Sequence, residues 1–293
     1  MRKLPELSDN KSGRDERLEQ TMGKQSTRLM MVRKAWCAVI RLTALLALAP
    51  PAHADQVSVA VAANFRAPME ALAPEFKRAT GHGIVASYGS TGKLYAQIRN
   101  GAPFEVLLAA DAKTPARLEQ EGAAVTGSRF TYAIGTLALW SPQAGVVDSR
   151  GDILRNGAGP STGGERAAFD RIALADPKLA PYGAAAMETL QALGVNDALQ
   201  PRIVIGEDIN QAYQFVASGN AAIGFVALSQ IMLEGTLTSG SAWIVPRNLY
   251  TPIRQDALML PPGRDKPAAL ALLQFLRGDR ARALITSFGY SVP

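Results

Sequence analysis

Four short segments of the sequence carry residues whose types and spacing suit the binding of an anion. They are Ala63-Asn64, Ser90-Thr91-Gly92, Pro181-Tyr182-Gly183 and Asp208-Ile209-Asn210. Each stands where an apolar strand is expected to end and a helix to begin, and together they offer hydroxyl groups, an amide and main-chain N–H groups. A helix start attracts anions, because its first N–H groups lack partners and the positive end of its dipole lies there. The four segments therefore indicate a site that binds an oxyanion without changing it chemically.

The donors in these segments are almost all neutral. A hydrogen bond to a charged group contributes about 1.5–3 kcal/mol, so about six or seven such bonds would hold a dianion without a counter-ion. Asn64, Ser90 and Thr91 also have a purely structural interpretation, since such residues cap helices whether or not a ligand binds. Tyr182 has the alternative of a packing aromatic, and Lys93 that of a solvated charge. The recurrence of polar residues at successive expected strand ends favours binding.

The residues of common catalytic and metal sites are nearly absent. The only cysteine, Cys37, lies in an N-terminal segment that we expect to be removed, and of the two histidines only His82 lies beyond that segment. This excludes disulfides, thiol nucleophiles, most zinc sites and the usual Ser-His-Asp triad. We therefore expect no catalytic residue and no direct ligation of a metal by side chains. A rival hypothesis, a secreted hydrolase or transferase, would use Asp111, Glu207 or Asp208 as acid or base, but no nucleophile–base pair accompanies them.

Residues 1–54 are expected to be a leader. Arg33-Lys34 precede a short apolar core at 42–49, and Ala52-His53-Ala54 forms a small-x-small cleavage site, so the mature chain is predicted to begin at Asp55 and to be exported to the periplasm. Residues 1–29 are too polar for a signal and suggest an over-extended reading frame. Ten of the 31 Lys and Arg side chains but five of the 25 Asp and Glu side chains fall in 1–54, which leaves 21 against 20 beyond it. A nucleic-acid partner is therefore not expected.

The remaining chain alternates apolar strands with amphipathic helices, which predicts an α/β fold of two Rossmann-like lobes with a ligand cleft between them. The first lobe is expected at 55–134 and 248–293, and the second at 135–247. The long apolar run 130–140 is predicted to cross from one sheet to the other. Asn64 is expected to cap a helix, and Pro74 to kink or break that helix. Residues 156–164 are expected to form a loop. Ligands of open α/β sheets bind beyond the carboxyl ends of the strands, which places the four polar segments at the cleft.

Several longer stretches resemble a known family. They are residues 62–65, 87–98, 100–104, 128–135, 180–183 and 224–228. In these the chain from about 55 to 293 is similar to the periplasmic molybdate-binding proteins of ABC importers, which have the type II periplasmic binding protein fold. The resemblance implies a monomer without a cofactor that holds a molybdate or tungstate ion between its lobes and delivers it to a permease in the inner membrane.

The resemblance also implies particular site residues. Asn64 and Thr91 would bind the oxyanion from the first lobe, with Ser90 next to the site; Tyr182 would offer its hydroxyl or main-chain N–H, and Ile209 its main-chain N–H. The chain departs from the family pattern in having Ala63 where a hydroxyl can stand and Thr91 where serine is usual, which leaves the number of donors open. Ala227 replaces a tyrosine, as in one branch of the family. The alternative within binding proteins is a sulfate or phosphate carrier; an iron carrier is disfavoured because the sequence has no adjacent tyrosine pair.

Overall fold

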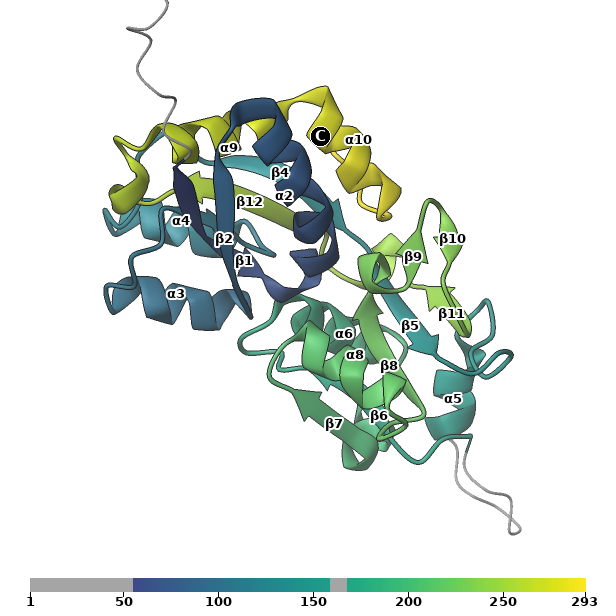
Figure 1. Ribbon diagram of the computed structural model, residues 1–293. Coiled ribbons are helices and arrows are strands. Elements are labelled where there is room, and N and C mark those ends of the chain that lie inside the picture. The colour runs from purple at the N-terminus through teal and green to yellow at the C-terminus, as the bar shows by residue number, and fades with distance from the viewer. Residues whose placement is uncertain (1–54, 159–167) are drawn as a thin grey trace, which may run out of the picture. The chain divides into compact units, whose positions relative to one another are not determined.

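The computed structural model describes residues 55–158 and 168–293, which belong to one compact unit built around two five-stranded sheets (Figure 1). The expected leader, and residues 159–164 of the expected loop, lie outside the described residues. The α/β fold class with two sheets is confirmed. The lobe boundaries at 134/135 and 247/248 stay a prediction. Below, "first lobe" means the elements around the first sheet and "second lobe" those around the second.

The first sheet has the strand order β2-β1-β3-β12-β4. Strands β1, β2 and β3 are parallel, and β12 runs antiparallel to both β3 and β4. The strands of this sheet are β1 (Gln56–Ala62), β2 (Gly83–Gly89), β3 (Val106–Leu108), β4 (Phe130–Gly135) and β12 (Ile253–Met259). The helices around it are η1 (Ala63–Phe65), α2 (Arg66–Thr80), α3 (Thr91–Arg99), α4 (Lys113–Gln120), η5 (Pro261–Gly263), α9 (Pro267–Arg277) and α10 (Asp279–Ser287).

The second sheet has the order β11-β5-β8-β6-β7. Strand β6 is parallel to β7 and β8, whereas β5 is antiparallel to β8 and β11. Its strands are β5 (Leu137–Ser141), β6 (Ile172–Ala175), β7 (Ile203–Gly206), β8 (Ile223–Ala227) and β11 (Ser241–Ile244), with a hairpin of β9 (Met232–Leu233) and β10 (Thr236–Leu237) nearby. Its helices are α5 (Asp152–Ala158), α6 (Pro181–Ala192), α7 (Asn196–Leu199), η2 (Gln200–Arg202), α8 (Ile209–Ala217), η3 (Leu228–Gln230) and η4 (Arg247–Leu249).

Alternating side chains give each sheet a core on both faces. In β1 the valines 57, 59 and 61 pack with α2, α9 and α10, while Ala60 packs on the other face with Leu94 of α3 and Leu118 of α4. In β5, Leu139 belongs to the core that α6 covers, and Trp140 to the core beneath α8. This period of two is the pattern expected of strands that are buried on both faces.

The chain crosses between the sheets in the middle of the apolar run 130–140. Strand β4 ends at Gly135 in the first sheet, and β5 begins at Leu137 in the second. Between them, the Thr136 carbonyl accepts a hydrogen bond from the Leu228 N–H at 2.9 Å. The run therefore belongs to both sheets, as predicted. The chain returns between β11 and β12, beside the same crossing point, where the Tyr250 hydroxyl accepts a bond from the Leu137 N–H at 3.2 Å.

Three local predictions were wrong. Asn64 does not cap α2: it lies in the short helix η1, and Phe65 is the N-cap residue. Helix α2 continues through Pro74, an exposed residue, without the break that the sequence allowed for. The expected loop at 156–164 begins inside a helix, since α5 runs to Ala158. Gly81, with φ of 79°, ends α2 in the left-handed conformation. Across residues 55–158 and 168–293, we find no helix of the length and apolarity that a membrane span requires.

Candidate functional site

All four polar segments meet at one small cavity between the ends of the two sheets. Its lining is Ala62, Ala63, Asn64, Gly89, Ser90, Thr91, Ala110, Ala180, Pro181, Tyr182, Asp208 and Ile209, and its volume is about 10 Å³. The first lobe contributes the ends of β1, β2 and β3, and the second contributes the starts of α6 and α8. All six residues predicted for the site, Ala63 included, are among the lining residues. Gly92, Gly183 and Asn210 are not.

Ser90 presents a hydroxyl that the protein does not use. It is the N-cap residue of α3, with extended backbone, yet its side chain makes no capping hydrogen bond. The residue is only 3% exposed, and its Oγ has no hydrogen-bond partner. A buried hydroxyl without a partner destabilises the fold, so such groups are rare unless something else satisfies them. Because Ser90 lines the cavity, this hydroxyl is a donor available to a guest.

Thr91 links the start of α3 to the segment that follows β3. Its Oγ1 accepts a hydrogen bond from the Ala110 N–H at 3.0 Å, and the residue is 1% exposed. Since the oxygen is the acceptor in that bond, the hydroxyl proton remains free to be donated. Ser90 and Thr91 thus bring two adjacent hydroxyls to the start of α3.

The second lobe presents main-chain donors. Helix α6 begins at Pro181, and Tyr182 follows within its first turn, where N–H groups have no carbonyl partner inside the helix. Helix α8 begins at Ile209, and the carboxylate of its N-cap residue Asp208 accepts bonds from the N–H groups of Asn210 (2.8 Å) and Gln211 (3.0 Å). The cap therefore leaves the Ile209 N–H for another acceptor. Gly183 is needed for the position of α6, because a Cβ there would lie 2.2 Å from the Ala175 carbonyl oxygen.

The Asn64 side chain is engaged away from any guest. Its Nδ2 donates to Gln255 Oε1 and to the Tyr290 hydroxyl, each at 2.9 Å, so both amide hydrogens are used. The sequence analysis predicts this amide as one of the donors of the site. In the structure its main-chain N–H is the donor that remains, at the start of η1.

Tyr182 likewise has its hydroxyl in a buried network. The Tyr182 hydroxyl accepts a bond from Gln255 Nε2 at 3.3 Å, and Gln255 Oε1 also accepts a bond from the Tyr132 hydroxyl at 3.1 Å. The sequence analysis did not predict Gln255, because it stands between Arg254 and Asp256 in β12, where a further polar residue gives no distinct signal. Of the two donors that the resemblance allowed for Tyr182, the main-chain N–H is therefore the one without a partner in the network.

The tyrosines of this network resist ionisation. Burial raises the pKa of Tyr132 and Tyr182 well above the ordinary value, and it raises the pKa of Tyr290 to about 12. The hydroxyl groups of these three tyrosines therefore stay neutral throughout the physiological pH range.

A consequence is a loss of stability at alkaline pH. An unfolded tyrosine ionises near pH 10, about two units below Tyr290 in the folded state, so the stabilisation is complete below pH 10 and is lost as the pH rises to 12. For Tyr290 alone the free energy of unfolding should fall by roughly 3 kcal/mol over that interval. Urea titrations from pH 9 to 12 measure it. Tyr290→Phe should flatten the slope, and an equal slope in both proteins would contradict the pKa shift.

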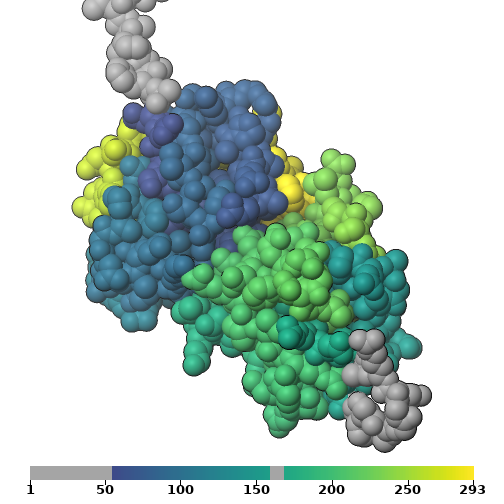
Figure 2. Space-filling model, turned by 60° about the horizontal axis from the view of Figure 1, so that its bottom comes forward, coloured from purple at the N-terminus to yellow at the C-terminus, as the bar shows by residue number. Residues whose placement is uncertain are grey.

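The cavity has no cationic lining. None of the residues that line it, all within the described chain, is Lys, Arg or His. Lys93 is close to Ser90 in the sequence, but its ammonium forms an ion pair with Glu207, which precedes α8. The hydrogen bond to Glu207 raises the pKa of Lys93. The Gly92 N–H donates to the Leu179 carbonyl at 2.9 Å. These bonds join the two lobes. In Figure 2 the blue atoms of the first lobe adjoin the green atoms of the second.

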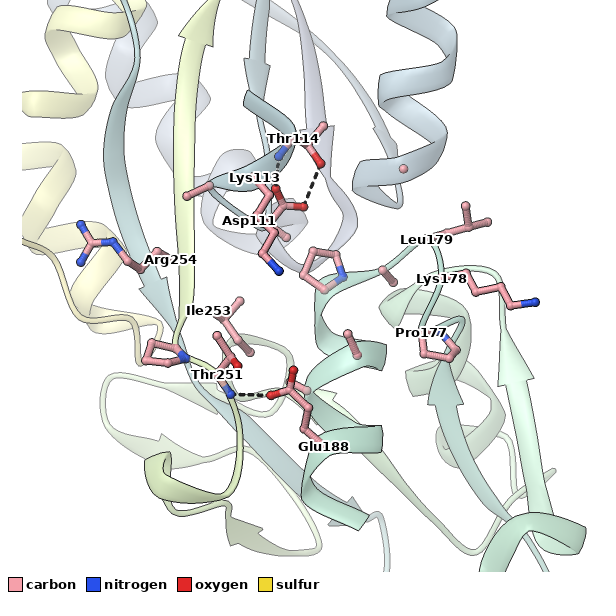
Figure 3. Close-up of a pocket in the computed structure, with 18 residues that line it drawn as sticks. Asp111, Lys113, Thr114, Pro177, Lys178, Leu179, Glu188, Thr251, Ile253 and Arg254 are labelled. Carbon is pink, nitrogen blue, oxygen red and sulfur yellow. Dashed lines mark hydrogen bonds between the residues drawn. The ribbon is translucent and has the colours of Figure 1, made fainter. Parts of the chain in front are cut away.

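A larger groove of about 530 Å³ adjoins the cavity and shares Ala110, Ala180 and Pro181 with it (Figure 3). Here Asp111 accepts bonds from the Thr114 N–H (2.6 Å) and hydroxyl (3.1 Å), and burial raises its pKa. Asp208 caps α8 and Glu207 pairs with Lys93, so each carboxylate of the hydrolase hypothesis has a structural partner. Among residues 55–158 and 168–293, no cluster of three His, Cys, Asp or Glu side chains could hold a metal ion.

Two α/β lobes whose helix starts converge on one cavity define a solute-binding protein. The family model described as bacterial extracellular solute-binding protein matches residues 57–291, and the chain belongs to this family, whose members bind solutes for transport and are not enzymes. The chain is 52% identical to the molybdate-binding protein ModA of Azotobacter vinelandii over 245 residues, which are 84% of this chain and 93% of the relative. It is 46% identical to ModA of Rhodobacter capsulatus over 250 residues, 85% and 93% of the two chains.

A solved structure agrees with these relatives. The periplasmic molybdate-binding protein of Azotobacter vinelandii superposes with a TM-score of 0.75 at 42% identity, covering 81% of this chain and 99% of that one. The resemblance inferred from the sequence is confirmed.

Proposed function

We propose that this protein binds molybdate in the small cavity and delivers it to an ABC transporter permease in the inner membrane. Two relatives with more than 45% identity are named as molybdate-binding proteins, and both are covered over 93% of their length. The cavity itself supports an oxyanion guest, since helix starts from both lobes line it and no cation does.

The observation that carries the proposal is the unpartnered hydroxyl of Ser90. This oxygen is buried beside Thr91, whose proton is also free, and across the cavity lie the first-turn N–H groups of α6 and α8. An oxyanion would accept bonds from all of them. The donors proposed for it are the hydroxyls of Ser90 and Thr91 and the main-chain N–H groups of Ala63, Asn64, Tyr182 and Ile209.

The spacing of the two walls would set the selectivity. A cavity of about 10 Å³ accommodates about one water-sized sphere, so a tetrahedral oxyanion requires the lobes to stand further apart than they do here. Because hydrogen bonds weaken steeply beyond their preferred length, the walls then fit an anion of one size. Sulfate is smaller than molybdate and would reach one wall only, whereas tungstate would fit as molybdate does.

The cellular setting is part of the same proposal. The protein would act in the periplasm as a monomer, without a cofactor and without binding nucleic acid, after cleavage of the leader before Asp55. Mass spectrometry of the protein recovered from the periplasm would report the mature N-terminus directly.

Retention of metal after gel filtration tests the function. The protein is expressed as the full chain, recovered from the periplasm, incubated with molybdate and desalted, and its molybdenum content is measured. We expect about one molybdenum per chain, and a thermal-shift panel should show large increases with molybdate and tungstate and small ones with sulfate and phosphate, because a tight ligand stabilises by mass action. No retained molybdenum and no selective shift would refute the proposal, and a larger shift with sulfate or phosphate would favour that carrier.

A further inference from the structure

Gln255 lies at the centre of a buried polar cluster behind the cavity. The residue is fully buried in β12, beside an irregularity in the pairing of β12 with β4. Irregularities of this kind re-aim side chains in a sheet. We call the group the Gln255 cluster; it consists of Asn64, Tyr132, Tyr182, Ser229, Gln255 and Tyr290.

Gln255 bonds to lining residues of both lobes. Its Oε1 accepts from Asn64 Nδ2 at 2.9 Å in the first lobe, and its Nε2 donates to the Tyr182 hydroxyl at 3.3 Å in the second. Asn64 and Tyr182 both line the cavity, and they come from different lobes, so we refer to an Asn64 wall and a Tyr182 wall. An amide offers an acceptor oxygen and a donor nitrogen on one side chain and stays neutral at every physiological pH. Neutrality matters, because a charge at this depth would act on a bound anion with little screening.

A glycine in the backbone beside the cluster leaves room for the bond between Gln255 and Tyr182. A Cβ on Gly135 would lie 2.1 Å from the Tyr182 hydroxyl and 2.7 Å from Gln255 Nε2. Gly135 is the last residue of β4, next to the point where the chain crosses between the sheets. Beside it, the Ser229 hydroxyl of the second lobe donates to the Asn64 carbonyl at 3.0 Å. These bonds of the cluster, unlike those of Gly92 and Lys93, lie near the crossing point, where a change in the angle between the lobes displaces atoms least.

We propose that Gln255 is a positioning residue of the oxyanion site: it sets the distance between the Asn64 wall and the Tyr182 wall, and with it the selectivity for molybdate over smaller oxyanions. This inference rests on the proposed function and adds a residue that touches no ligand. Its side chain holds the two residues from which main-chain donors of the two walls extend. Without it, each lobe keeps its own donors, but the side-chain link between the Asn64 wall and the Tyr182 wall is lost.

The test compares Gln255→Leu and Gln255→Glu with a matched control, Tyr132→Phe. Tyr132→Phe also removes bonds from the cluster, to Gln255 Oε1 and to the Ala109 carbonyl, but both partners belong to the first lobe. Molybdate and sulfate Kd values are measured by calorimetry on the full protein, with the melting temperature of each ligand-free variant. Gln255→Leu should weaken molybdate binding about tenfold or more and reduce the ratio of the two Kd values, since a bond worth about 1.4 kcal/mol corresponds to tenfold. Tyr132→Phe should lower the melting temperature but leave the ratio unchanged.

Gln255→Glu adds a readout that a merely structural role would not give. A protonated Glu offers one O–H donor and one acceptor oxygen, as Gln does, whereas the carboxylate loses the donor and repels the anion. Because position 255 is fully buried, the pKa of a glutamate there should lie above its ordinary value. Molybdate binding by this variant should therefore approach the wild-type value at pH 5.5 and weaken as the pH rises to 8, against an unchanged wild-type profile. The variant also keeps the proposal testable should Gln255→Leu fail to fold. Wild-type affinity and Kd ratio in Gln255→Glu at every pH would overturn the inference, whereas absence of molybdate binding by the wild type would overturn the proposed function instead.

Discussion

Ser90→Asp is expected to abolish molybdate binding at micromolar concentrations. The substitution places a carboxylate at the cavity wall, where no lining residue is cationic. Two like unit charges about 4 Å apart repel by about 4 kcal/mol at an effective dielectric constant of 20. That energy corresponds to a roughly thousandfold higher Kd, and the second charge of the anion adds to it. Calorimetric titration with molybdate measures the effect.

The matched control for this charge is Ser90→Ala, which removes the hydroxyl alone. It should raise Kd about ten- to a hundredfold, because one bond to a charged acceptor is lost. Its melting temperature without ligand should be equal to or higher than that of the wild type, since Ser90 Oγ has no partner in the protein and a buried hydroxyl without one destabilises the fold. Equal Kd values for Ser90→Asp and Ser90→Ala would mean that the anion binds elsewhere.

Ile209→Pro is expected to weaken molybdate binding about ten- to a hundredfold while leaving α8 folded. Proline has no N–H, so the variant removes one proposed main-chain donor. Ile209 is the first residue of α8, a position that favours proline, and Asp208 before it is extended with φ −145° and ψ −180°, as the residue preceding a proline should be. The bonds that Asp208 accepts from Asn210 and Gln211 are unaffected.

Ile209→Val provides the comparison, since it keeps the N–H and an apolar side chain at this buried position. It should bind molybdate within about threefold of the wild type, less than the loss of one charged hydrogen bond. Circular dichroism and melting temperature show whether α8 persists in both variants. If the proline and valine variants bind equally well, the Ile209 N–H is not a donor to the anion.

The fold and the location of the site could be predicted because both follow from local patterns. Alternating apolar residues identify strands that are buried on both faces, and the ends of parallel strands meet at one edge of a sheet. The segments at 63–64, 90–92, 181–183 and 208–210 could therefore be assigned to one site from the sequence alone. The division of the run 130–140 between the sheets followed from its length, because a strand of that length exceeds the usual span of one sheet.

The roles of individual side chains could not be predicted in the same way. Asn64 was expected to cap α2, but its partners Gln255 and Tyr290 lie 191 and 226 positions away in the sequence. Pairing over such distances leaves no local pattern, and the competition between capping and the cluster is decided by the tertiary fold. Gln255 could be recognised only once the structure placed β12 between β3 and β4.

A crystal structure of the protein with molybdate, with the metal located by its anomalous scattering, tests the central claim most directly. We expect molybdenum between the start of α3 and the starts of α6 and α8, with its oxygen atoms about 2.6–3.2 Å from the hydroxyls of Ser90 and Thr91 and from main-chain N–H groups. No Lys or Arg nitrogen should lie within about 4 Å of the anion, the distance that defines an ion pair. Molybdenum in the neighbouring groove beside Lys113, or an ammonium or guanidinium group in contact with the anion, would contradict binding by neutral donors.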